Sequence, residues 1–401
     1  MTTRKLILTL AAPCVLCAPL QLSASGFQVL ERSARGLGRA FSGEAAIADD
    51  ASIISSNPAG MIMLDGTSIS TGLTYADPVV NLNGSNPLGQ QADAKDVIEE
   101  ALIPYFYLSH KVDNQLALGL ALYTTHGLKN SYSDDFSAKI SPQSTELETI
   151  TIEPALAYRI NQQWSLGIGI SAVYAEAKLR GRSVPPFPVP DVESTGSDWS
   201  WGYHLGVLYE CSENTRFGLY YKSNVNLNLK GDNVVNGNQR AGSLEVDLPE
   251  TIEFSAYHQL NDNWAIHGDV VWTHWSRFEE LNFNDPEIPV TTENWDNSMR
   301  YAIGATYFYN DSWTFRAGFS YEESPVPDAQ HRTVRIPDAD RYWLAVGASY
   351  QLNECYALDF GYSYITSATA DIEETEIPNG LFDGESDASV HLVSVGISGS
   401  F

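Results

Sequence analysis

The chain ends in the stretch His391-Leu392-Val393-Ser394-Val395-Gly396-Ile397-Ser398-Gly399-Ser400-Phe401. Side chains on a strand project alternately to its two faces, so this stretch has one apolar face and one face of small polar residues. The apolar face carries His391, Val393, Val395, Ile397, Gly399 and Phe401. A strand that is apolar outside, polar inside and ends in an aromatic residue is typical of the closing strand of a bacterial outer-membrane barrel. A soluble edge strand has a similar pattern, so the rest of the chain has to decide.

The same alternation recurs from about residue 67 onward, in stretches separated by connections that are alternately short and long. Asn and Asp in the short connections bond to their own main chain and tolerate tight turns. A large apolar or aromatic residue, such as Trp164 or Trp264, follows most of them, as expected of an aromatic girdle at one membrane interface. The short connections are Asp113-Asn114, Asn161-Gln162-Gln163, Ser212-Glu213-Asn214, Asn261-Asp262-Asn263, Asn310-Asp311 and Asn353-Glu354. The long ones lie near residues 77–100, 128–147, 181–197, 230–243, 281–296, 324–338 and 367–387.

Six short and seven long connections join fourteen strands, and an even number of strands is typical of a single-chain bacterial barrel. Tilted strands of roughly ten residues are long enough to span the hydrocarbon core. The sequence therefore predicts an all-β fold: a 14-stranded antiparallel transmembrane β-barrel over residues 67–401, in the bacterial outer membrane. We expect Phe401 to be needed for outer-membrane assembly by the barrel assembly machinery.

Composition agrees with such a barrel and argues against nucleic-acid binding. Only 43% of the residues are hydrophobic, which suffices because alternate residues of each strand face lipid. The 21 Tyr and 9 Trp suit interfacial girdles. The net charge of −27 leaves no basic footprint for nucleic acid. We expect the acidic loops to meet lipopolysaccharide and other outer-membrane lipid.

Residues 1–24 are typical of a signal peptide, because Arg4 and Lys5 precede an apolar run and small residues follow it at Ser23-Ala24. The apolar run is too short for a convincing membrane-spanning helix. Two of the four cysteines lie within it. Whether the other two, Cys211 and Cys355, pair with each other is left open by the sequence.

Residues 25–66 do not alternate and are rich in small residues and helix formers. One interpretation is a periplasmic tail, but disordered segments are poor in apolar residues such as Phe27, Phe41 and Met61. We therefore expect a partly helical hatch that plugs the lumen of the barrel.

Three motifs lie in this segment: Gly26-Phe27-Gln28, Gly36-Leu37-Gly38-Arg39-Ala40-Phe41-Ser42-Gly43-Glu44 and Asn57-Pro58-Ala59-Gly60-Met61. They closely resemble the N-terminal hatch of the FadL outer-membrane transporters, and His126-Gly127-Leu128 continues the resemblance into the barrel. The resemblance implies passive uptake of hydrophobic small molecules. Long-chain fatty acids are the leading ligand, and aromatic hydrocarbons are the alternative.

The resemblance also implies a route, in which extracellular loops capture the ligand, an inner pocket binds it, and the hatch rearranges. The ligand then leaves sideways through a gap at a kinked third strand. Gly127 is assigned to the kink, Phe27 to the inner pocket, and Asn57-Pro58-Ala59 to a hatch element that moves or anchors. Met61 and Met63 line the pocket floor or pack the hatch, because Met adapts to varied neighbours. Val184, Phe187 and Val189, in a proline-stiffened loop, form a candidate capture surface.

Neither a catalytic nor a metal-binding constellation stands out, so we expect no enzyme and no cofactor. His204 and His267 fall on separate expected strands without metal-ligand spacing. The sequence has no nucleophile elbow and no glycine-rich phosphate loop. An open diffusion porin would lack the apolar 25–66 segment. A structural or adhesive outer-membrane barrel is the alternative from another class. We expect a monomer.

Overall fold

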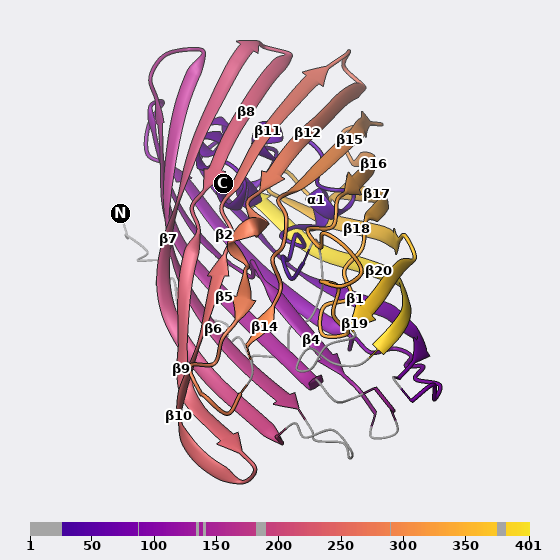
Figure 1. Ribbon diagram of the computed structural model, residues 1–401. Helices are drawn as coiled ribbons and strands as arrows, with labels where there is room; N and C mark the ends of the chain where they lie inside the picture. Colours follow the sequence, from indigo (N-terminus) through magenta and orange to yellow (C-terminus); the bar gives the residue numbers. More distant parts are fainter. Residues whose placement is uncertain are drawn as a thin grey trace, which may run out of the picture.

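The computed structural model describes residues 26–86, 88–133, 136–138, 142–181, 190–288, 290–374 and 382–401. Its main feature is one antiparallel sheet that closes on itself (Figure 1). Closure occurs because β1 (Thr67–Ser85) pairs with β2 (Ala101–Lys111) on one side and with the last strand, β20 (Phe382–Ser400), on the other. The predicted 14-stranded antiparallel β-barrel is confirmed. The predicted signal peptide lies outside the described residues.

Ten of the fourteen strands are continuous and four are interrupted. The other continuous strands are β5 (Pro142–Arg159), β6 (Trp164–Gly181), β7 (Val192–Ser212), β12 (Trp264–Thr273), β15 (Ser298–Phe308), β16 (Trp313–Glu322) and β17 (Arg341–Gln351). The interrupted strands are β3 (Leu116–Tyr123) with β4 (Gly127–Ser131), β8 (Thr215–Lys222) with β9 (Val225–Val235), β10 (Asn238–Leu248) with β11 (Thr251–Gln259), and β18 (Tyr356–Ser367) with β19 (Ala370–Glu374). A short pair, β13 (Glu280–Leu281) and β14 (Thr291–Thr292), lies in the connection after β12.

The closing strand has the alternation that its sequence predicted. Val393, Val395 and Ile397 are exposed on the outer face, whereas Ser394 and Ser398 are buried toward the lumen. Phe401 continues the pairing with the start of β1, because its backbone N–H donates to the Thr67 carbonyl and its carbonyl accepts from the Thr67 N–H, both at 2.9 Å. Its ring packs edge-on against Tyr356 at 5.1 Å.

The short connections are tight turns closed by their own side chains. The side-chain oxygen of Asn161, Oδ1, accepts hydrogen bonds from the backbone N–H groups of Gln163 at 2.9 Å and Trp164 at 3.0 Å. The same pattern recurs at Asp113, Asn261, Asn310 and Asn353. Aromatic rings pair across strands beside these turns: Trp164 with Tyr209, Trp264 with Tyr307 and Trp313 with Tyr350, at 4.5 to 4.7 Å. Short turns mark the periplasmic end of a bacterial barrel, so this end faces the periplasm. Cys211 and Cys355 lie near it as free thiols.

One predicted long loop is largely strand. Residues 230–243 form the tip of the β9–β10 hairpin, whose turn is Asn236-Gly237. Both turn residues have positive φ, at 49° and 81°, which is the conformation that favours Asn-Gly in two-residue hairpins. The acidic and polar composition suggested a loop, but the Asn-Gly pair was the stronger signal.

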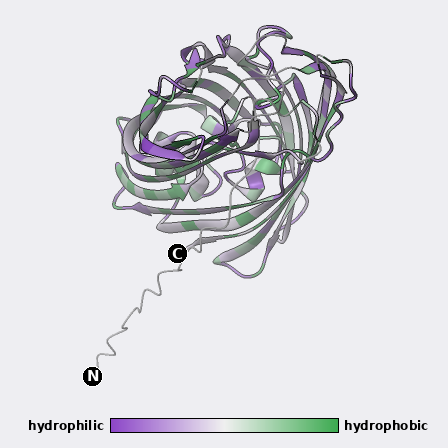
Figure 2. Ribbon diagram, turned by 60° about the horizontal axis from the view of Figure 1, so that its bottom comes forward, coloured by the Kyte–Doolittle hydropathy of each residue, from purple (hydrophilic) through white to green (hydrophobic). Residues whose placement is uncertain are grey.

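The N-terminal segment, residues 26–64, lies inside the ring of strands (Figure 2). It contains two single-turn α-helices, α1 (Ala34–Leu37) and α2 (Glu44–Ile47), and two 3-10 helices, η1 (Ala51–Ser55) and η2 (Pro58–Met63). Within the described chain, no helix has the length and apolar character needed to cross a membrane. The segment contacts strands around much of the barrel, from β1 and β2 to β18 and β20.

The third strand is broken between β3 and β4, at residues 124–126. Pairing between β2 and β3 begins where Phe106 lies opposite Leu122 and continues to the periplasmic end, where Lys111 lies opposite Ala117. β4 pairs with β5. Residues 101–105 of β2 therefore have no strand partner on this side among the described residues. The opening closes again toward the outside of the cell, where Ile98 forms a bridge with Asn130. We call this opening the wall window.

Candidate functional site

Buried ion pairs fix the N-terminal segment to the wall. Arg35 Nε donates to the Asp359 carboxylate of β18 at 2.9 Å, and another guanidinium nitrogen donates to Ser398 Oγ of β20 at 2.6 Å. In the same cluster, Arg316 of β16 reaches the partly exposed Asp49 carboxylate at 3.3 Å, and Asp49 also lies 3.8 Å from Arg35. Asp49 and Asp50 both lie within 3.8 Å of the Arg35 guanidinium, so loss of one carboxylate leaves this charge partly compensated.

Wall side chains also bond to the main chain of this segment. The Asp269 carboxylate accepts from the Gly43 N–H at 2.7 Å, and the Glu253 carboxylate accepts from the Ala45 N–H at 3.0 Å. The Arg300 guanidinium donates to the Ala40 carbonyl at 3.2 Å. The charged lumen of β11, β12 and β15 is therefore a binding surface for the segment's backbone.

Glycines on the inner face of the wall allow the segment to approach closely. A Cβ atom at Gly218 would overlap the Ala45 carbonyl oxygen, and one at Gly318 would overlap the Arg39 carbonyl oxygen. The same holds at Gly206, where a Cβ would meet the side-chain oxygen of Asn57. These glycines are seats for the segment, spread over several strands.

Asn57-Pro58-Ala59 ties the segment together rather than lining a pocket. The Asn57 side chain accepts from the Ala59 N–H at 3.1 Å and donates to the carbonyls of Ala45, at 2.7 Å, and Val207, at 3.0 Å. Pro58 is the first residue of η2. The tripeptide thus connects η2, α2 and strand β7.

Met61 and Met63 pack in the lower part of the lumen. Met61 is buried among the rings of Tyr105, Tyr107 and Tyr123, and Met63 packs against the edge of this cluster. Phe27 belongs to a different apolar cluster. The structure therefore does not bring these methionines to the pocket that surrounds Phe27.

The Phe27 ring is enclosed by four other rings, which we call the aromatic box: His126, Trp275, Phe278 and Trp295. Its centroid lies 4.9 Å from that of Trp275, 5.4 Å from Phe278, 5.8 Å from His126 and 6.1 Å from Trp295. Phe27 is only 2% exposed. The box rings come from two places: the break in the third strand and the connection after β12, which folds into the lumen through the 3-10 helix η3 (Trp275–Arg277).

Aliphatic side chains extend the box toward the extracellular end. The inner face of the β9–β10 hairpin contributes Leu227, Leu229, Leu244 and Val246 to the same cluster, and β6 contributes Leu179. This is the largest apolar cluster in the described part of the barrel. Its size and its central position make it suitable for a hydrophobic ligand.

A polar cavity adjoins the box on the other side of residues 28–30. It is lined by Gln28, Val29 and Leu30 together with charged groups from the segment and the wall. Those charged groups are Arg32, Lys222, Glu253, Arg300 and Glu322. Thr125 lines the cavity while its neighbour His126 belongs to the box, so the two spaces meet at the break in the third strand.

Lys222 is the unusual member of this set. It is 8% exposed, and its ammonium group has no hydrogen bond or ion pair within the described residues. Arg32 and Arg300, in contrast, donate to backbone carbonyls of Ser55 and Ala40. An unpaired buried ammonium beside an apolar pocket is suited to binding the carboxylate of an amphipathic ligand.

The start of the segment covers the wall window from inside. The Val29 N–H donates to the Thr125 carbonyl and the Gly127 N–H donates to the Phe27 carbonyl, both at 2.9 Å. Outside these bonds, the Lys129 ammonium spans the rim to Glu99 at 2.9 Å. Residues 27–29 thus form backbone hydrogen bonds with the broken part of the third strand.

Gly127 lies directly after the break, as the first residue of β4. It is absent from the glycines with positive φ in the described chain, which are Gly26, Gly43, Gly66, Gly89 and Gly237. A left-handed backbone is therefore not the reason for glycine at this position.

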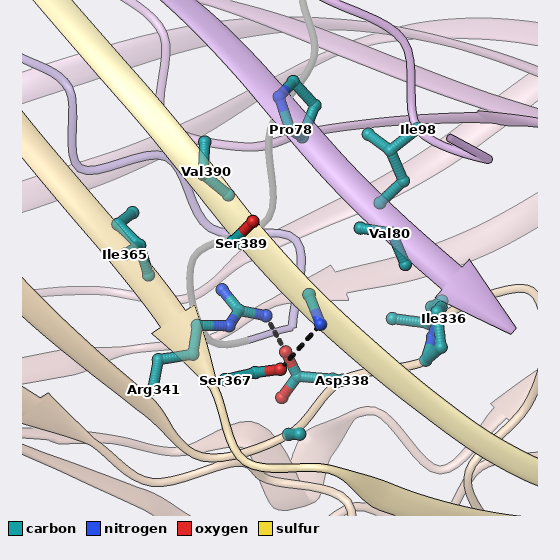
Figure 3. A pocket seen from close by; sticks show the side chains of 13 residues that line it. Pro78, Val80, Ile98, Ile336, Asp338, Arg341, Ile365, Ser367, Ser389 and Val390 are labelled. Carbon is teal, nitrogen blue, oxygen red and sulfur yellow. Dashed lines mark hydrogen bonds and ion pairs between the residues drawn. The ribbon is translucent and has the colours of Figure 1, made fainter. Parts of the chain in front are cut away.

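A second apolar space lies higher in the lumen, near the extracellular ends of β1, β17, β18 and β20 (Figure 3). Pro78, Val80, Ile98, Ile365 and Val390 line it, and the Asp338–Arg341 ion pair forms its base. Because Ile98 also forms the outer edge of the wall window, this cleft and the window are neighbours.

His204 and His267 are structural. The His204 ring lies 3.1 Å from the Glu153 carboxylate and 3.1 Å from Ser171 Oγ. Ser171 also donates a hydrogen bond to Glu153, and all three side chains are buried. His267 contacts Ser42 of the segment at 2.8 Å. Within the described residues, no group of three or more His, Cys, Asp or Glu side chains could hold a metal ion.

The candidate capture residues Val184, Phe187 and Val189 lie outside the described residues. Sequence reasoning did not single out Trp275, Phe278, Trp295 or Lys222. The available signal was the run Trp272-Thr273-His274-Trp275, which continues the aromatic residues past the end of a strand.

Comparisons with known proteins agree with this architecture. Residues 15–401 match the family model described as outer membrane protein transport protein (OMPP1/FadL/TodX). The long-chain fatty acid transport protein of Salmonella typhi is 34% identical over 384 residues, covering 86% of this chain and 88% of the relative. The crystal structure of a Pseudomonas aeruginosa FadL homologue superposes with a TM-score of 0.86 at 22% identity, covering 94% of this chain and 100% of that one.

The Ralstonia pickettii toluene transporter TbuX has the same fold, with a TM-score of 0.71 at 17% identity over 94% of this chain and 99% of its own. The predicted resemblance is confirmed by the family match and by the identity to curated relatives. The chain belongs to the OMPP1/FadL/TodX family of outer membrane transport proteins.

Proposed function

We propose that this protein takes up long-chain fatty acids passively across the outer membrane. The observation that carries the proposal is the pairing of two adjoining spaces, the apolar cluster around Phe27 and the cavity that contains the unpaired Lys222 ammonium. Together they match a molecule with a long apolar chain and one carboxylate. The curated relative from Salmonella typhi, named as a long-chain fatty acid transport protein, supports this ligand class.

The thermodynamics suit a transporter. Transfer of each CH₂ group from water into the apolar cluster is favourable by about 0.8 kcal/mol, which offsets the cost of crossing the polar lipopolysaccharide layer. Release needs an exit, and the wall window opens toward the bilayer beside the pocket. The Phe27 and Val29 bonds to the third strand couple the pocket to the window, because a ligand that displaces Phe27 also loosens residues 27–29.

The route in this proposal has four steps. Extracellular loops, including Val184, Phe187 and Val189, capture the ligand, and the box binds its chain in place of Phe27. Residues 25–66 act as the hatch, with Asn57-Pro58-Ala59 as an anchor and only the first residues moving. The ligand then leaves sideways through the window beside Gly127, into the outer leaflet. We expect the protein to work as a monomer, surrounded by lipopolysaccharide.

Replacing the proposed carboxylate partner tests the ligand class. Lys222→Met keeps the length of the side chain and removes the charge, so oleate binding to the purified protein should weaken roughly tenfold or more. Lys230→Met is the matched control, because Lys230 is exposed on β9. Unchanged oleate affinity in Lys222→Met would contradict the fatty-acid proposal.

Aromatic-hydrocarbon uptake is a second candidate, because the Phe27 pocket is lined by four rings that all contact Phe27. A hydrocarbon has no carboxylate, so Lys222→Met should leave its uptake unchanged. Toluene uptake by cells, with oleate uptake measured in parallel, separates the two candidates. Strong toluene uptake without oleate uptake would favour the second one.

A further inference from the structure

Three ring nitrogens in the aromatic box have no hydrogen bond of good geometry among the described residues: His126 Nε2, Trp275 Nε1 and Trp295 Nε1. Their side chains are 1%, 0% and 2% exposed. The Trp295 indole does lie beside the Glu293 carboxyl, which its N–H approaches. Buried polar groups are paired in the great majority of cases, and an unpaired one costs about 1–3 kcal/mol. Three in one apolar compartment call for a partner that occupies the box.

The three groups are close enough to serve one bound molecule. The ring centroids of His126 and Trp275 lie 6.3 Å apart, and those of Trp275 and Trp295 lie 5.1 Å apart. Phe27 contacts all three rings. A molecule that takes the place of the Phe27 ring therefore meets all three side chains.

The two indole nitrogens of the set only donate. His126 Nδ1 lies 3.0 Å from the Thr125 hydroxyl, and His126 Nε2 joins the donors in the tautomer in which that hydroxyl donates to Nδ1. Such a site matches a group that accepts hydrogen bonds, and a plain hydrocarbon chain cannot supply one.

Glu293, in the loop that carries Trp295, adds to this polar character. It is 1% exposed, and neither of its carboxylate oxygens has a hydrogen bond of good geometry. Burial raises the pKa of Glu293 to about 8, although Arg335 and the neighbouring Trp295 lower it in part. At neutral pH the protonated carboxyl is a further donor beside the box.

We propose that the box selects hydrophobic chains that carry an additional oxygen, as a hydroxyl or a keto group, over unsubstituted chains of the same length. The inference rests on the proposed function, in which the box holds the ligand chain and Lys222 holds the carboxylate. The adjoining positions of the two spaces place the oxygen some distance along the chain from the carboxylate. Trp275, Trp295 and His126 then determine specificity.

A pair of ligands that differ by one oxygen tests the proposal. Oleate, ricinoleate, which is oleate with a hydroxyl on the chain, and the keto analogue of ricinoleate are titrated into the full-length protein by calorimetry. Ricinoleate and the keto analogue should bind about tenfold more tightly than oleate, as one hydrogen bond to a buried donor provides. The keto analogue only accepts hydrogen bonds, so its preference identifies the site as a donor.

Trp275→Phe and Trp295→Phe keep a ring and remove the N–H. Each should bring the affinities of ricinoleate and oleate to within about twofold of each other, whatever the variant does to the absolute affinity for oleate. Trp343→Phe is the matched control, because the Trp343 indole N–H is also buried and unpaired but lies against Phe41, outside the box. It should keep the preference for ricinoleate.

Equal affinities of the wild-type protein for oleate and ricinoleate would overturn the inference without reference to any variant, and would leave the proposed function standing. An equal loss of both ligands in the Trp variants would also overturn it, because the donors would then receive the carboxylate. If the wild-type protein binds none of the three ligands, the proposed function fails and the inference falls with it.

Discussion

Phe27→Ala should increase ligand affinity while it lowers stability. Phe27 fills the box, with four rings at centroid distances of 4.9 to 6.1 Å and 2% exposure. Burial of a phenylalanine side chain contributes about 2 kcal/mol relative to exposure. An incoming ligand has to displace this ring, so it loses that contribution from its own binding free energy.

Without the ring, the ligand enters an empty box. A gain of about 2 kcal/mol corresponds to a Kd roughly 30-fold lower. Release becomes slower in proportion if association is unchanged, so uptake into cells should fall even though binding improves. The cavity destabilises the protein by about 3–5 kcal/mol, which lowers the Tm.

The assay is competitive displacement of labelled oleate from the purified protein, with thermal unfolding measured on the same samples. Phe41→Ala is the matched control. Phe41 is also fully buried in the N-terminal segment, but it packs against Trp343 outside the box. It should lower the Tm and leave the Kd unchanged. Weaker oleate binding in Phe27→Ala would refute the reasoning, because Phe27 would then build the site instead of occupying it.

Three further changes test other parts of the structure. Deletion of residues 26–64 should leave a barrel that conducts small ions in planar bilayers, since the segment fills the lumen; conductance equal to wild type would contradict this. Asp359→Asn should loosen the Arg35 end of the segment, seen as faster proteolysis of the N-terminal segment, whereas Asp383→Asn at the exposed end of β20 should not. Asp49 and Asp50 remain within 3.8 Å of Arg35, so the cost should stay below the ~3–5 kcal/mol of a fully unpaired buried charge. The native state keeps the Glu293 proton up to a pKa of about 8, while the unfolded chain releases it near the ordinary pKa of 4.5. Stability should therefore fall as pH rises through that interval. Glu293→Gln should raise the Tm at pH 8 and not at pH 4, and an equal rise at both pH values would count against a buried protonated Glu293.

Local rules were enough to predict the barrel from its sequence. The alternation of Val393, Ser394 and Val395 has a period of two residues, which only a strand with two different faces satisfies. The Asn161 and Asn261 turns close through their own side chains, so a short window contains all their information. The number of strands could therefore be predicted from local sequence patterns, without any contact between residues distant in the sequence.

The site depended on contacts that no local pattern contains. Trp275 reaches Phe27 because the connection after β12 turns into the lumen, and the sequence of that connection resembles an ordinary polar loop. Lys222 and Arg216 are an even number of residues apart on β8, so both side chains point into the lumen. Whether Lys222 finds a partner there depends on which side chains the neighbouring strands place beside it. Pairing across strands is a property of register, and register lies outside single-sequence reasoning.

The glycine seats of the wall limit how such a protein can diversify. Gly206, Gly218 and Gly318 fit one backbone path of the N-terminal segment, so a segment transplanted from a relative would meet a clash wherever its path differed by the width of a methyl group. The N-terminal segment and the wall residues that it contacts must therefore change together. Three of the four rings that surround Phe27 belong to the connection after β12, and the glycine of the segment that fits closely against them is Gly26. New ligand preferences can arise there while the fitted interior of the barrel is inherited unchanged.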